Sequence, residues 1–502
     1  MIQNITLLLC AVLTLTVSAQ TVNIEGDPYG GNPYASINDA VAASTNAADV
    51  ILVTGIHTES VTIQKSITLR GTDPSADIIQ AAASPGSDGS GTRVLSLNEG
   101  AFTINIENLG IRHGNVTGNG GGIFVDKVTG SVSLSNLIVE NNYASSNGGA
   151  IGLAGTIATI SECTIQNNTS NLDGGAILAA PNNASGINSV IDIKQSLIDS
   201  NTGRNGGAIY INGNANFGND YLIEVNIENS TISNNSATSA SGGNGGGAIW
   251  SASRPWTSNT AVGNITLGLV HATFYNNAHA ALNKSGLQFG SAAQTNFSAY
   301  NSIVVAGDDV TVKALNFANT NTTDVINCIL GGLNAAPALV DDVNKNNQKG
   351  KTATFAGLTG TLTDEGGSTL VLPISESSTA DDYCTAATGI TMPTIDQRGY
   401  TREGVQDAGA FEFGGTLSVE NVASKDNTLK IFPNPAKVIL HLSSSNTITR
   451  AFIYDMTGKR VFQSQKINNN SLDVSQLKVG LYTLQVEDIN HNWSSNKLVI
   501  SR

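Results

Sequence analysis

Positive charge is scarce in this 502-residue sequence. Charged residues make up only 13% of it, and 25 Lys and Arg stand against 39 Asp and Glu, which gives a formal net charge of −14. A protein that binds nucleic acid presents a basic face to the phosphates, so this balance argues against a nucleic-acid partner. Neutral sugars, proteins and cations stay open as ligands.

Long apolar runs are also rare. One run at the N-terminus covers residues 5–17, which is too short to span a bilayer, and it ends in small residues at positions 17–19. This pattern predicts a secretory signal peptide over residues 1–19 and no transmembrane span in the mature chain. We therefore expect the mature protein in the extracellular space or on the outer cell surface.

Residues that build metal sites are few and scattered. The sequence has 6 His, and it contains neither His-Glu-x-x-His nor Cys-x-x-Cys. We therefore predict no metal site and no cofactor. Acidic pairs such as Asp308-Asp309 and Asp381-Asp382 leave Ca²⁺ open, although they lack the spacing of a calcium loop.

Glycine, with 53 residues, and asparagine are in excess, and both disfavour helices and favour turns. From about residue 100 to about residue 330 they recur in a repeat. Glycine pairs stand at Gly121-Gly122, Gly148-Gly149, Gly174-Gly175, Gly206-Gly207 and Gly246-Gly247. The segments between the pairs, aligned on a final Asn, give two apolar columns: Ile106, Leu134, Ile160, Ile193, Ile227 and Leu269, and then Ile111, Val139, Ile165, Ile198, Ile232 and Phe274.

Apolar residues alternate with polar ones around both columns, which indicates short β-strands with one buried face. A short strand cannot bury that face alone, so successive repeats must stack. We predict an all-β fold, a right-handed parallel β-helix with about three short strands per repeat. One corner would hold a polar column whose amides bond along the axis: Asn108, Asn136, Glu162, Gln195, Asn229, His271, Asn301 and Asn327.

The segment before the repeats predicts a cap. Residues 36–43 read as a short amphipathic helix with Ser36 as its N-cap, and strands are expected at 50–54, 61–63 and 67–69. An open solenoid end exposes strand edges, so a capping helix is expected there. This opening resembles that of pectinesterase- and pectate-lyase-like β-helix proteins, and we assign residues 20–356 to the cap and the β-helix.

Residues 357–415 depart from the repeat. They contain Asp396-Gln397-Arg398-Gly399 and, shortly afterwards, Asp407-Ala408-Gly409-Ala410-Phe411-Glu412. This pair of motifs resembles the choice-of-anchor Q segment that closes many bacterial surface β-helices. The charged residues of both motifs, together with Arg402, resemble an active site, but we expect them to be structural ion pairs that close the solenoid end.

Residues 416–502 predict a small C-terminal β-sandwich, with strands at 429–432, 438–442, 450–455, 460–463, 471–474, 480–486 and 497–500. The motifs Ile431-Phe432-Pro433-Asn434-Pro435, Gly480-Leu481-Tyr482 and Lys497-Leu498-Val499-Ile500 resemble the type A C-terminal sorting domain of the type IX secretion system. The resemblance implies that the type IX secretion machinery is a partner. It also implies export and removal of this domain, followed by release or surface anchoring.

One local group has the residue types that a polysaccharide lyase uses. Asp192 and Lys194 share a strand, Asp199 lies on the next strand, and Arg204 lies in the loop after it. A surface pair of Lys194 with Glu228 in the next coil explains the same pattern. The sequence therefore leans against an enzyme, and a lyase or glycoside hydrolase acting on the β-helix exterior is the alternative.

Aromatic residues make up only 5% of the chain, and some lie where a ligand could reach them. Tyr210 and Trp250 occupy outward positions, and Arg254 and Trp256 follow in a long loop, so these residues are the predicted glycan-binding set. Loops that fold over and bury the rings are the competing interpretation. The predicted function is adhesion or glycan binding at the cell surface, and a structural surface stalk is a further alternative.

Removal of the signal peptide leaves three cysteines, an odd number that argues against a disulfide framework. Cys163 and Cys328 fall in one column of the repeat, five coils or about 24 Å apart at about 4.8 Å per coil. A disulfide needs Cα atoms within about 7 Å. We expect Cys163, Cys328 and Cys384 to be free thiols.

Overall fold

The computed structural model divides into two compact units, Met1–Leu417 and Ser418–Arg502, which are treated separately below. It describes residues 20–501 except 182–187, 214–221, 240–244, 253–263, 281–285, 290–293, 310, 317–319, 335–342, 386–391, 417–428, 445–446, 456–459, 465–466, 468–469 and 489–492. The predicted signal peptide lies outside the described residues. None of the helices in the described part is long and apolar enough to cross a membrane.

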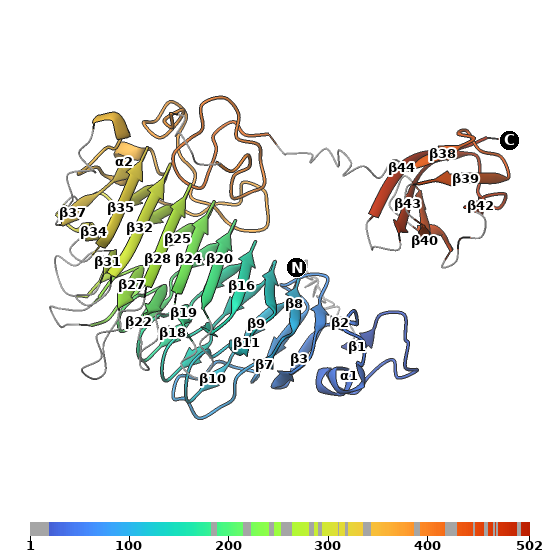
Figure 1. Ribbon diagram of the computed structural model, residues 1–502, viewed down its shortest axis with the longest axis horizontal. Helices are drawn as coiled ribbons and strands as arrows, with labels where there is room; N and C mark the ends of the chain where they lie inside the picture. The colour runs from blue at the N-terminus through green and yellow to red at the C-terminus, as the bar shows by residue number, and fades with distance from the viewer. Residues whose placement is uncertain are drawn as a thin grey trace, which may run out of the picture. The chain divides into compact units, whose positions relative to one another are not determined.

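The first unit is a parallel β-solenoid whose strands stack into four sheets (Figure 1). Sheet A is the 11-stranded sheet of β1 (Thr21–Ile24), β2 (Val50–Thr54), β5 (Ile67–Arg70), β8 (Thr103–Glu107), β12 (Ser131–Ser135), β16 (Ile157–Ser161), β20 (Ser189–Lys194), β24 (Leu222–Glu228), β28 (Asn264–Val270), β32 (Gln294–Tyr300) and β35 (Thr320–Ile326). Sheet B is the 10-stranded sheet of β3 (Ile56–Thr58), β6 (Ile78–Gln80), β9 (Gly110–Arg112), β13 (Ile138–Glu140), β17 (Thr164–Gln166), β21 (Leu197–Asp199), β25 (Thr231–Ser233), β29 (Thr273–Tyr275), β33 (Ile303–Val305) and β36 (Ile329–Leu330).

The other two sheets complete each coil. Sheet C has 10 strands, β4 (Val61–Ile63), β7 (Leu95–Gly100), β11 (Ile123–Val128), β15 (Ile151–Ala154), β19 (Ile177–Ala180), β23 (Ile209–Asn212), β27 (Ile249–Ala252), β31 (Leu287–Phe289), β34 (Lys313–Asn316) and β37 (Gly332–Asn334). Sheet D has 6 strands, β10 (Asn115–Val116), β14 (Tyr143–Ala144), β18 (Thr169–Ser170), β22 (Thr202–Gly203), β26 (Ser236–Ala237) and β30 (Ala278–His279). The sequence predicted about three strands per repeat and missed sheet D, because two residues are too few to show an alternating pattern.

The strand register confirms both apolar columns. Leu134 pairs with Ile106 and with Ile160 in sheet A, and Val139 pairs with Ile111 and with Ile165 in sheet B. All these side chains are fully buried in one continuous core. Each coil therefore contributes to the same apolar interior, as the alternation predicted.

The polar column at the corner between sheets A and B is a column of tight turns. Its residues have φ angles between +45° and +57°, and only some of their side chains bond along the axis, such as Asn136 to Asn108 at 2.9 Å. The sequence placed the amide ladder here, but the ladder that the structure contains lies one corner further on. Its members are the final Asn of each repeat: Asn142, Asn168, Asn201, Asn235 and Asn277.

This second column is buried, with side chains at most 5% exposed, and each member bonds to the next. The Oδ1 of Asn201 accepts from the backbone N–H of Asn168 at 3.0 Å and from its Nδ2 at 2.9 Å. Its Nδ2 donates to the carbonyl oxygens of Ile165 and Asp199, both at 2.9 Å. The ladder thus satisfies backbone groups at a buried corner where the strands stop, which explains why only Asn occupies the five described positions.

A helical cap covers the N-terminal end, as predicted. Helix α1 (Ile37–Ala43) begins at Ser36, whose Oγ accepts from the backbone N–H of Asp39 at 3.0 Å. Glu59 from the loop after β3 accepts the backbone N–H of Ile37 at 2.9 Å. Ile37 and Ala40 are fully buried, so the helix closes the apolar interior at this end.

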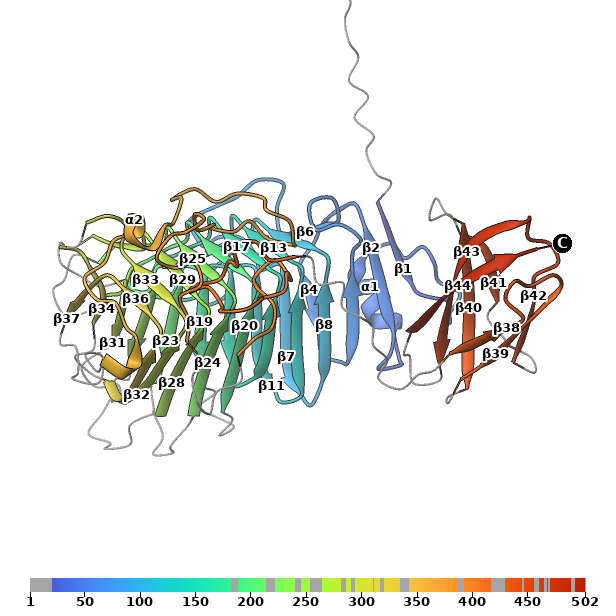
Figure 2. The ribbon, with the colours of Figure 1, turned by 90° about the horizontal axis from the view of Figure 1, so that it is seen from above.

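After sheet A ends, the chain forms a short 3₁₀ helix η2 (Val343–Lys345) and helix α2 (Ala353–Ala356), and then the segment that we call the flank segment, residues 357–416. From the sequence we expected this segment to close the end of the solenoid. Instead it runs back along the side of the β-helix, beside the corner between sheets A and B (Figure 2). Its contacts reach from Asn327, bonded to the carbonyl of Thr385 at 2.7 Å, to Glu162, which accepts from Ser368 Oγ at 2.8 Å.

The second unit contains two antiparallel sheets around its own core, as predicted. One sheet has the order β38 (Lys430–Phe432), β39 (Ile439–Ser443) and β42 (Ser471–Asp473). The other has the order β41 (Arg460–Ser464), β40 (Ile448–Asp455), β43 (Gly480–Asp488) and β44 (Trp493–Ile500). The core includes Leu440, Ile453, Leu484 and Leu498, all fully buried.

Cys163, Cys328 and Cys384 are free and buried, which confirms the expectation from the repeat. Cys163 follows β16 and Cys328 follows β35, five strands apart in sheet A. Burial raises the pKa of Cys163 and of Cys328 to about 12, so neither thiol is a nucleophile at neutral pH.

The Asn ladder provides the first test of the fold. Replacing Asn201 with Ala removes bonds to two carbonyls and two donors at a fully buried site, so we expect a loss of about 2–4 kcal/mol in the free energy of unfolding. Asn226→Ala, on the half-buried outer face of sheet A, should change stability by less than about 1 kcal/mol. Denaturant unfolding measures both, and equal effects would contradict a structural ladder.

Candidate functional site

The four candidate catalytic residues point to three different faces of the coil. Asp192 and Lys194 lie on the outer face of sheet A, where Asp192 accepts from the Asn226 side chain at 3.0 Å. Asp199 lies on sheet B and accepts from Ser233 Oγ at 2.6 Å and from Asn234 Nδ2 at 2.9 Å. Successive strands of a solenoid face different directions, so nearness in sequence did not bring these side chains together.

Arg204 lies just beyond sheet D and pairs with Asp173 of the previous coil. Its Nε and Nη2 each lie 3.1 Å from a carboxylate oxygen of Asp173, and Asn205 donates to the same carboxylate at 2.8 Å. The arginine therefore joins two neighbouring turns. The lyase site suggested by Asp192, Lys194, Asp199 and Arg204 does not form.

The predicted glycan-binding set is only partly described. Arg254 and Trp256 lie outside the described residues. Glycan binding requires an exposed Trp250, but this side chain is only 3% exposed, as the competing interpretation has it, and Tyr210 beside it in register is half-buried. The glycine turns explain this burial, because Gly206 lets the Trp250 side chain of the next coil pack onto it: an added Cβ would lie 3.1 Å from Trp250 Cβ.

The charged residues of the two flank-segment motifs form a buried network. Arg402 is fully buried and donates to Glu412 at 2.9 Å, to the Asn229 side chain at 3.0 Å and to the Gly409 carbonyl at 2.9 Å. Arg398 bonds to the buried Asp396 at 2.7 Å. Both ion pairs lie within the flank segment, and the bond from Arg402 to Asn229 joins that segment to the β-helix. The pairs are therefore structural, as predicted, although the segment lies along the side of the solenoid.

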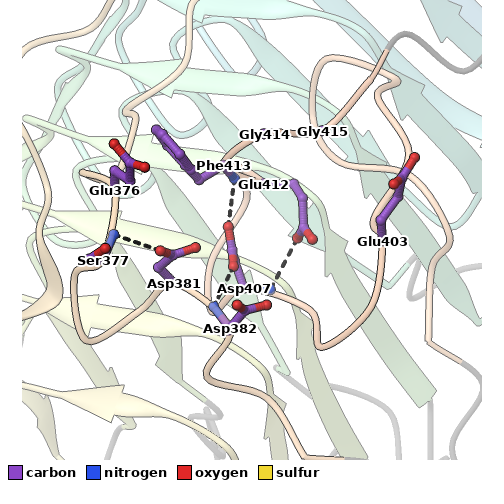
Figure 3. Close-up of a pocket in the computed structure, with 10 residues that line it drawn as sticks. All are labelled: Glu376, Ser377, Asp381, Asp382, Glu403, Asp407, Glu412, Phe413, Gly414 and Gly415. Carbon is purple, nitrogen blue, oxygen red and sulfur yellow. Dashed lines mark hydrogen bonds between the residues drawn. The ribbon is translucent and has the colours of Figure 1, made fainter.

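Two carboxyls of this network open onto an acidic cavity of about 290 Å³ (Figure 3). Asp407 accepts from the backbone N–H groups of Asp382 and Phe413, and Glu412 accepts from that of Asp407. Glu376, Asp381, Asp382 and Glu403 also line the cavity. Burial raises the pKa of Asp407 to about 6 and that of Glu412 to about 7, even though Arg402 opposes the rise.

Paired carboxyls with raised pKa values occur in glycoside hydrolases, but here their oxygens hold backbone N–H groups and an arginine. Glu412 and Asp407 are only 3% and 2% exposed. Among the described residues, no group of three or more His, Cys, Asp or Glu side chains is arranged to hold a metal ion. The positions of Asp407 and Glu412 are thus explained by the backbone and arginine bonds that fold the flank segment.

Two hollows on the solenoid exterior were not found from the sequence. One, of about 240 Å³, lies on sheet A beside Gly268, the register partner of Ser298, and is lined by Thr266, Asn296, Phe297, Ser298, Thr323 and Asp324. The other, of about 160 Å³, lies on sheet B between Arg112 and Glu140. The alternation beside the apolar columns identifies the outward residues that line both hollows, but the hollows can be located only once the strand register is known.

We expect the attachment of the flank segment to weaken as pH rises. The pKa of Asp407 is raised from 3.8 to about 6, mainly by burial and also by the charge of Asp381. Because the folded state holds this proton more tightly than the unfolded state, the protonated carboxyl contributes its full stabilisation below about pH 4. The contribution is lost as pH rises through about 6. The difference of about two pKa units corresponds to about 3 kcal/mol.

Thermal unfolding between pH 4 and pH 7 measures this effect. Asp407→Asn cannot ionise and should show a flatter decline of melting temperature than the wild type. Glu376→Gln, at an exposed position of the same cavity, is the matched control and should retain the wild-type decline. An unchanged slope in Asp407→Asn would show that this carboxyl does not control the pH dependence.

Comparison with known proteins assigns the C-terminal unit. Residues 430–501 match the family described as the secretion system C-terminal sorting domain, and residues 162–180 match a Chlamydia polymorphic membrane protein repeat. An endo-acting ulvan lyase of Formosa agariphila is 32% identical over 90 residues, which cover 17% of this chain and 17% of that protein. The resemblance of residues 357–415 to choice-of-anchor Q segments stays a prediction.

Among solved structures, the pectin methylesterase of Yersinia enterocolitica aligns with 58% of this chain and 90% of its own, at 13% identity and a TM-score of 0.32. The strand register and the sorting-domain match together define the protein's organisation. It is a β-helix protein whose C-terminal sorting domain directs it through type IX secretion to the cell surface or the extracellular space.

Proposed function

We propose that the exported β-helix binds a polysaccharide on its exterior and acts in adhesion. The observation that carries this proposal is the outer face of sheet A, where a column of small polar side chains runs along the solenoid axis. Its members are Asn105, Ser133, Thr159, Asp192, Asn226, Gly268, Ser298 and Asp324. Every one is half-buried, and adjacent members lie about 4.8 Å apart along the axis.

Gly268 interrupts this column and is the register partner of Ser298, which lines the hollow described above. The hollow offers hydroxyl and amide groups from Thr266, Ser298 and Asn296, and the buried Phe297 lies beneath it in the core. Such neutral hydrogen-bonding groups suit a sugar, whose hydroxyls need both donors and acceptors.

Asp324 at the edge of the hollow is held in place by two donors. Tyr300 Oη donates to it at 2.8 Å and Lys345 Nζ at 2.9 Å. Burial and the bond to Asp324 raise the pKa of Tyr300 to about 12, so this phenol is unsuited to act as a base at neutral pH. The arrangement favours binding over proton abstraction, which supports adhesion over the alternative of a polysaccharide lyase.

Filling the hollow tests the proposal. An added Cβ at Gly268 would lie 3.0 Å from Asn226 Oδ1 and 3.6 Å from Ser298 Oγ, so a longer side chain fits there with a small shift of Asn226. Gly268→Gln in the full chain should weaken polysaccharide retention about tenfold, while the melting temperature stays near that of the wild type.

Ser133→Gln, in the same column but far from the hollow, is the matched control and should bind as the wild type does. Retention is measured by affinity electrophoresis against a panel of soluble polysaccharides, with reducing-end release followed in parallel. Equal binding by both variants would remove the hollow from the proposal. Release of reducing ends or unsaturated products by the wild type would establish an enzyme instead.

The sorting domain gives a separate prediction about delivery. Because each unit has its own core, deleting residues 418–502 should leave the β-helix folded but retained inside the cell. Cell fractionation with protease protection of the retained product measures both properties. Normal amounts of the truncated chain outside the cell would contradict the role assigned to the domain.

A further inference from the structure

The outer face of sheet B carries an opposite-charge pair that does not close. Arg112 on β9 and Glu140 on β13 are direct partners in the register. Arg112 turns away, and its Nε donates to Gln80 Oε1 at 2.9 Å. Glu140 turns the other way, and its Oε2 accepts from Gln166 Nε2 at 2.9 Å.

The two charges are thus separated by a cleft instead of joined by a salt bridge. Of the ion pairs formed between described residues, none includes Arg112. Its two terminal nitrogens and the second oxygen of Glu140 have no hydrogen bond within the described part of the chain. The cleft measures about 160 Å³ and has both groups in its lining.

Apolar side chains form much of the rest of the cleft, together with Ser75 and Gln166. Ile138 lies in its floor, and Pro74 and Ile78 stand on the side of the preceding coil. The loop that carries Pro74 comes so close to β9 that a Cβ at Gly110 would lie 2.7 Å from the Pro74 carbonyl oxygen. Glycine at position 110 therefore shapes the cleft by allowing this approach.

The flank segment leaves this part of the β-helix uncovered. Its furthest described contact toward the N-terminal end is Ser368 on Glu162, in the turn just before β17. Beyond that point, towards α1, the outer face of sheet B at Arg112, Ile138 and Glu140 is half-buried and reachable from solvent. The cleft is thus open, while the later strands of sheet B are covered.

We propose that this cleft binds a saccharide unit carrying a carboxylate or a sulfate ester. The anionic group would accept two hydrogen bonds from the planar guanidinium of Arg112, which matches both oxyanions in geometry. Hydroxyls of the same sugar would donate to Glu140 and bond to Gln166, and the C–H face of the ring would lie on Ile138. This inference rests on the proposed polysaccharide binding and names a class of polymer for it.

The negative net charge of the chain allows the contribution of Arg112 to be measured separately from any general attraction. The chain has a formal net charge of −14, so an acidic polymer gains no general attraction to the surface. An affinity for acidic sugars must therefore come from a local cationic group. Moderate salt should lower that affinity, because the ion pair in the cleft is partly open to solvent.

The test uses the full chain and three tetrasaccharides that share a galactose-type ring: one of galacturonate, one sulfated and one neutral. Isothermal titration calorimetry measures the affinity for each. We expect the wild type to bind at least one acidic tetrasaccharide at least tenfold more tightly than the neutral one. Arg112→Gln should remove that preference and leave the affinity for the neutral sugar unchanged.

Arg70→Gln is the matched control, because Arg70 is also a surface arginine of the β-helix but is paired with Glu107 at 2.8 Å. It should keep the acidic preference. Arg112→Lys keeps the positive charge but lacks the planar guanidinium, so its affinity for the acidic sugar should fall only in part. Melting curves of all variants show whether each one is folded. If Arg112→Gln is misfolded, Ile138→Ser provides the test, with a loss expected for acidic and neutral sugars alike.

The outcomes separate this inference from the proposed function. Unchanged acidic preference in Arg112→Gln, or a wild type without such a preference that still retains polysaccharides, overturns the cleft and leaves polysaccharide binding in place. Failure of the wild type to retain any polysaccharide overturns both. Whichever acidic tetrasaccharide binds more tightly, the galacturonate or the sulfated one, identifies the anionic group as a carboxylate or a sulfate ester.

Discussion

Every feature of the first unit depends on hydrogen bonding between one coil and the next. Apart from β1, which pairs antiparallel with β2, the strands of sheets A, B, C and D pair in parallel with strands of the neighbouring coil, so a residue is placed beside its equivalent one coil away. Because strand side chains alternate between two faces, each position becomes a column that is either buried or exposed. Columns of Ile, Leu and Val form the core, and columns of polar residues form the exterior. A buried column of Asn then completes the corner where backbone pairing is interrupted.

The flank segment is held differently, because it has almost no regular secondary structure and so makes few backbone ladders with the coils. It is held by side chains that reach the β-helix from outside, with the fully buried Arg402 at the centre. Burying an arginine requires that its donors be satisfied, and Glu412, Asn229 and the Gly409 carbonyl provide acceptors. The same burial leaves Asp407 and Glu412 with raised pKa values at the edge of an acidic cavity. Features that could suggest catalysis are explained by attachment.

The exterior of the β-helix is where a function can reside. Its interior is a packed apolar core, and the two hollows described above lie on sheets A and B. Sheet A offers neutral polar groups around Gly268, and sheet B offers a separated pair of charges around Ile138. A surface of this kind suits an extended polymer better than a small molecule, which agrees with delivery of the protein to the cell exterior.

The sequence by itself determined about three of the four strands of each coil, the two apolar columns, the capping helix at Ser36, the free cysteines and the C-terminal sandwich. These follow from local alternation, capping chemistry and the spacing of repeats, all of which depend on residues that are close together in the sequence. Only the tertiary structure decided which Asn column forms the ladder, that the flank segment lies along the side, and that Trp250 is buried. It also decided that Lys194, Asp199 and Arg204 face apart while Arg112 and Glu140 face one cleft. The physical reason is that a coil turns its successive strands to different sides, so function depends on neighbours one coil away rather than on neighbours in sequence.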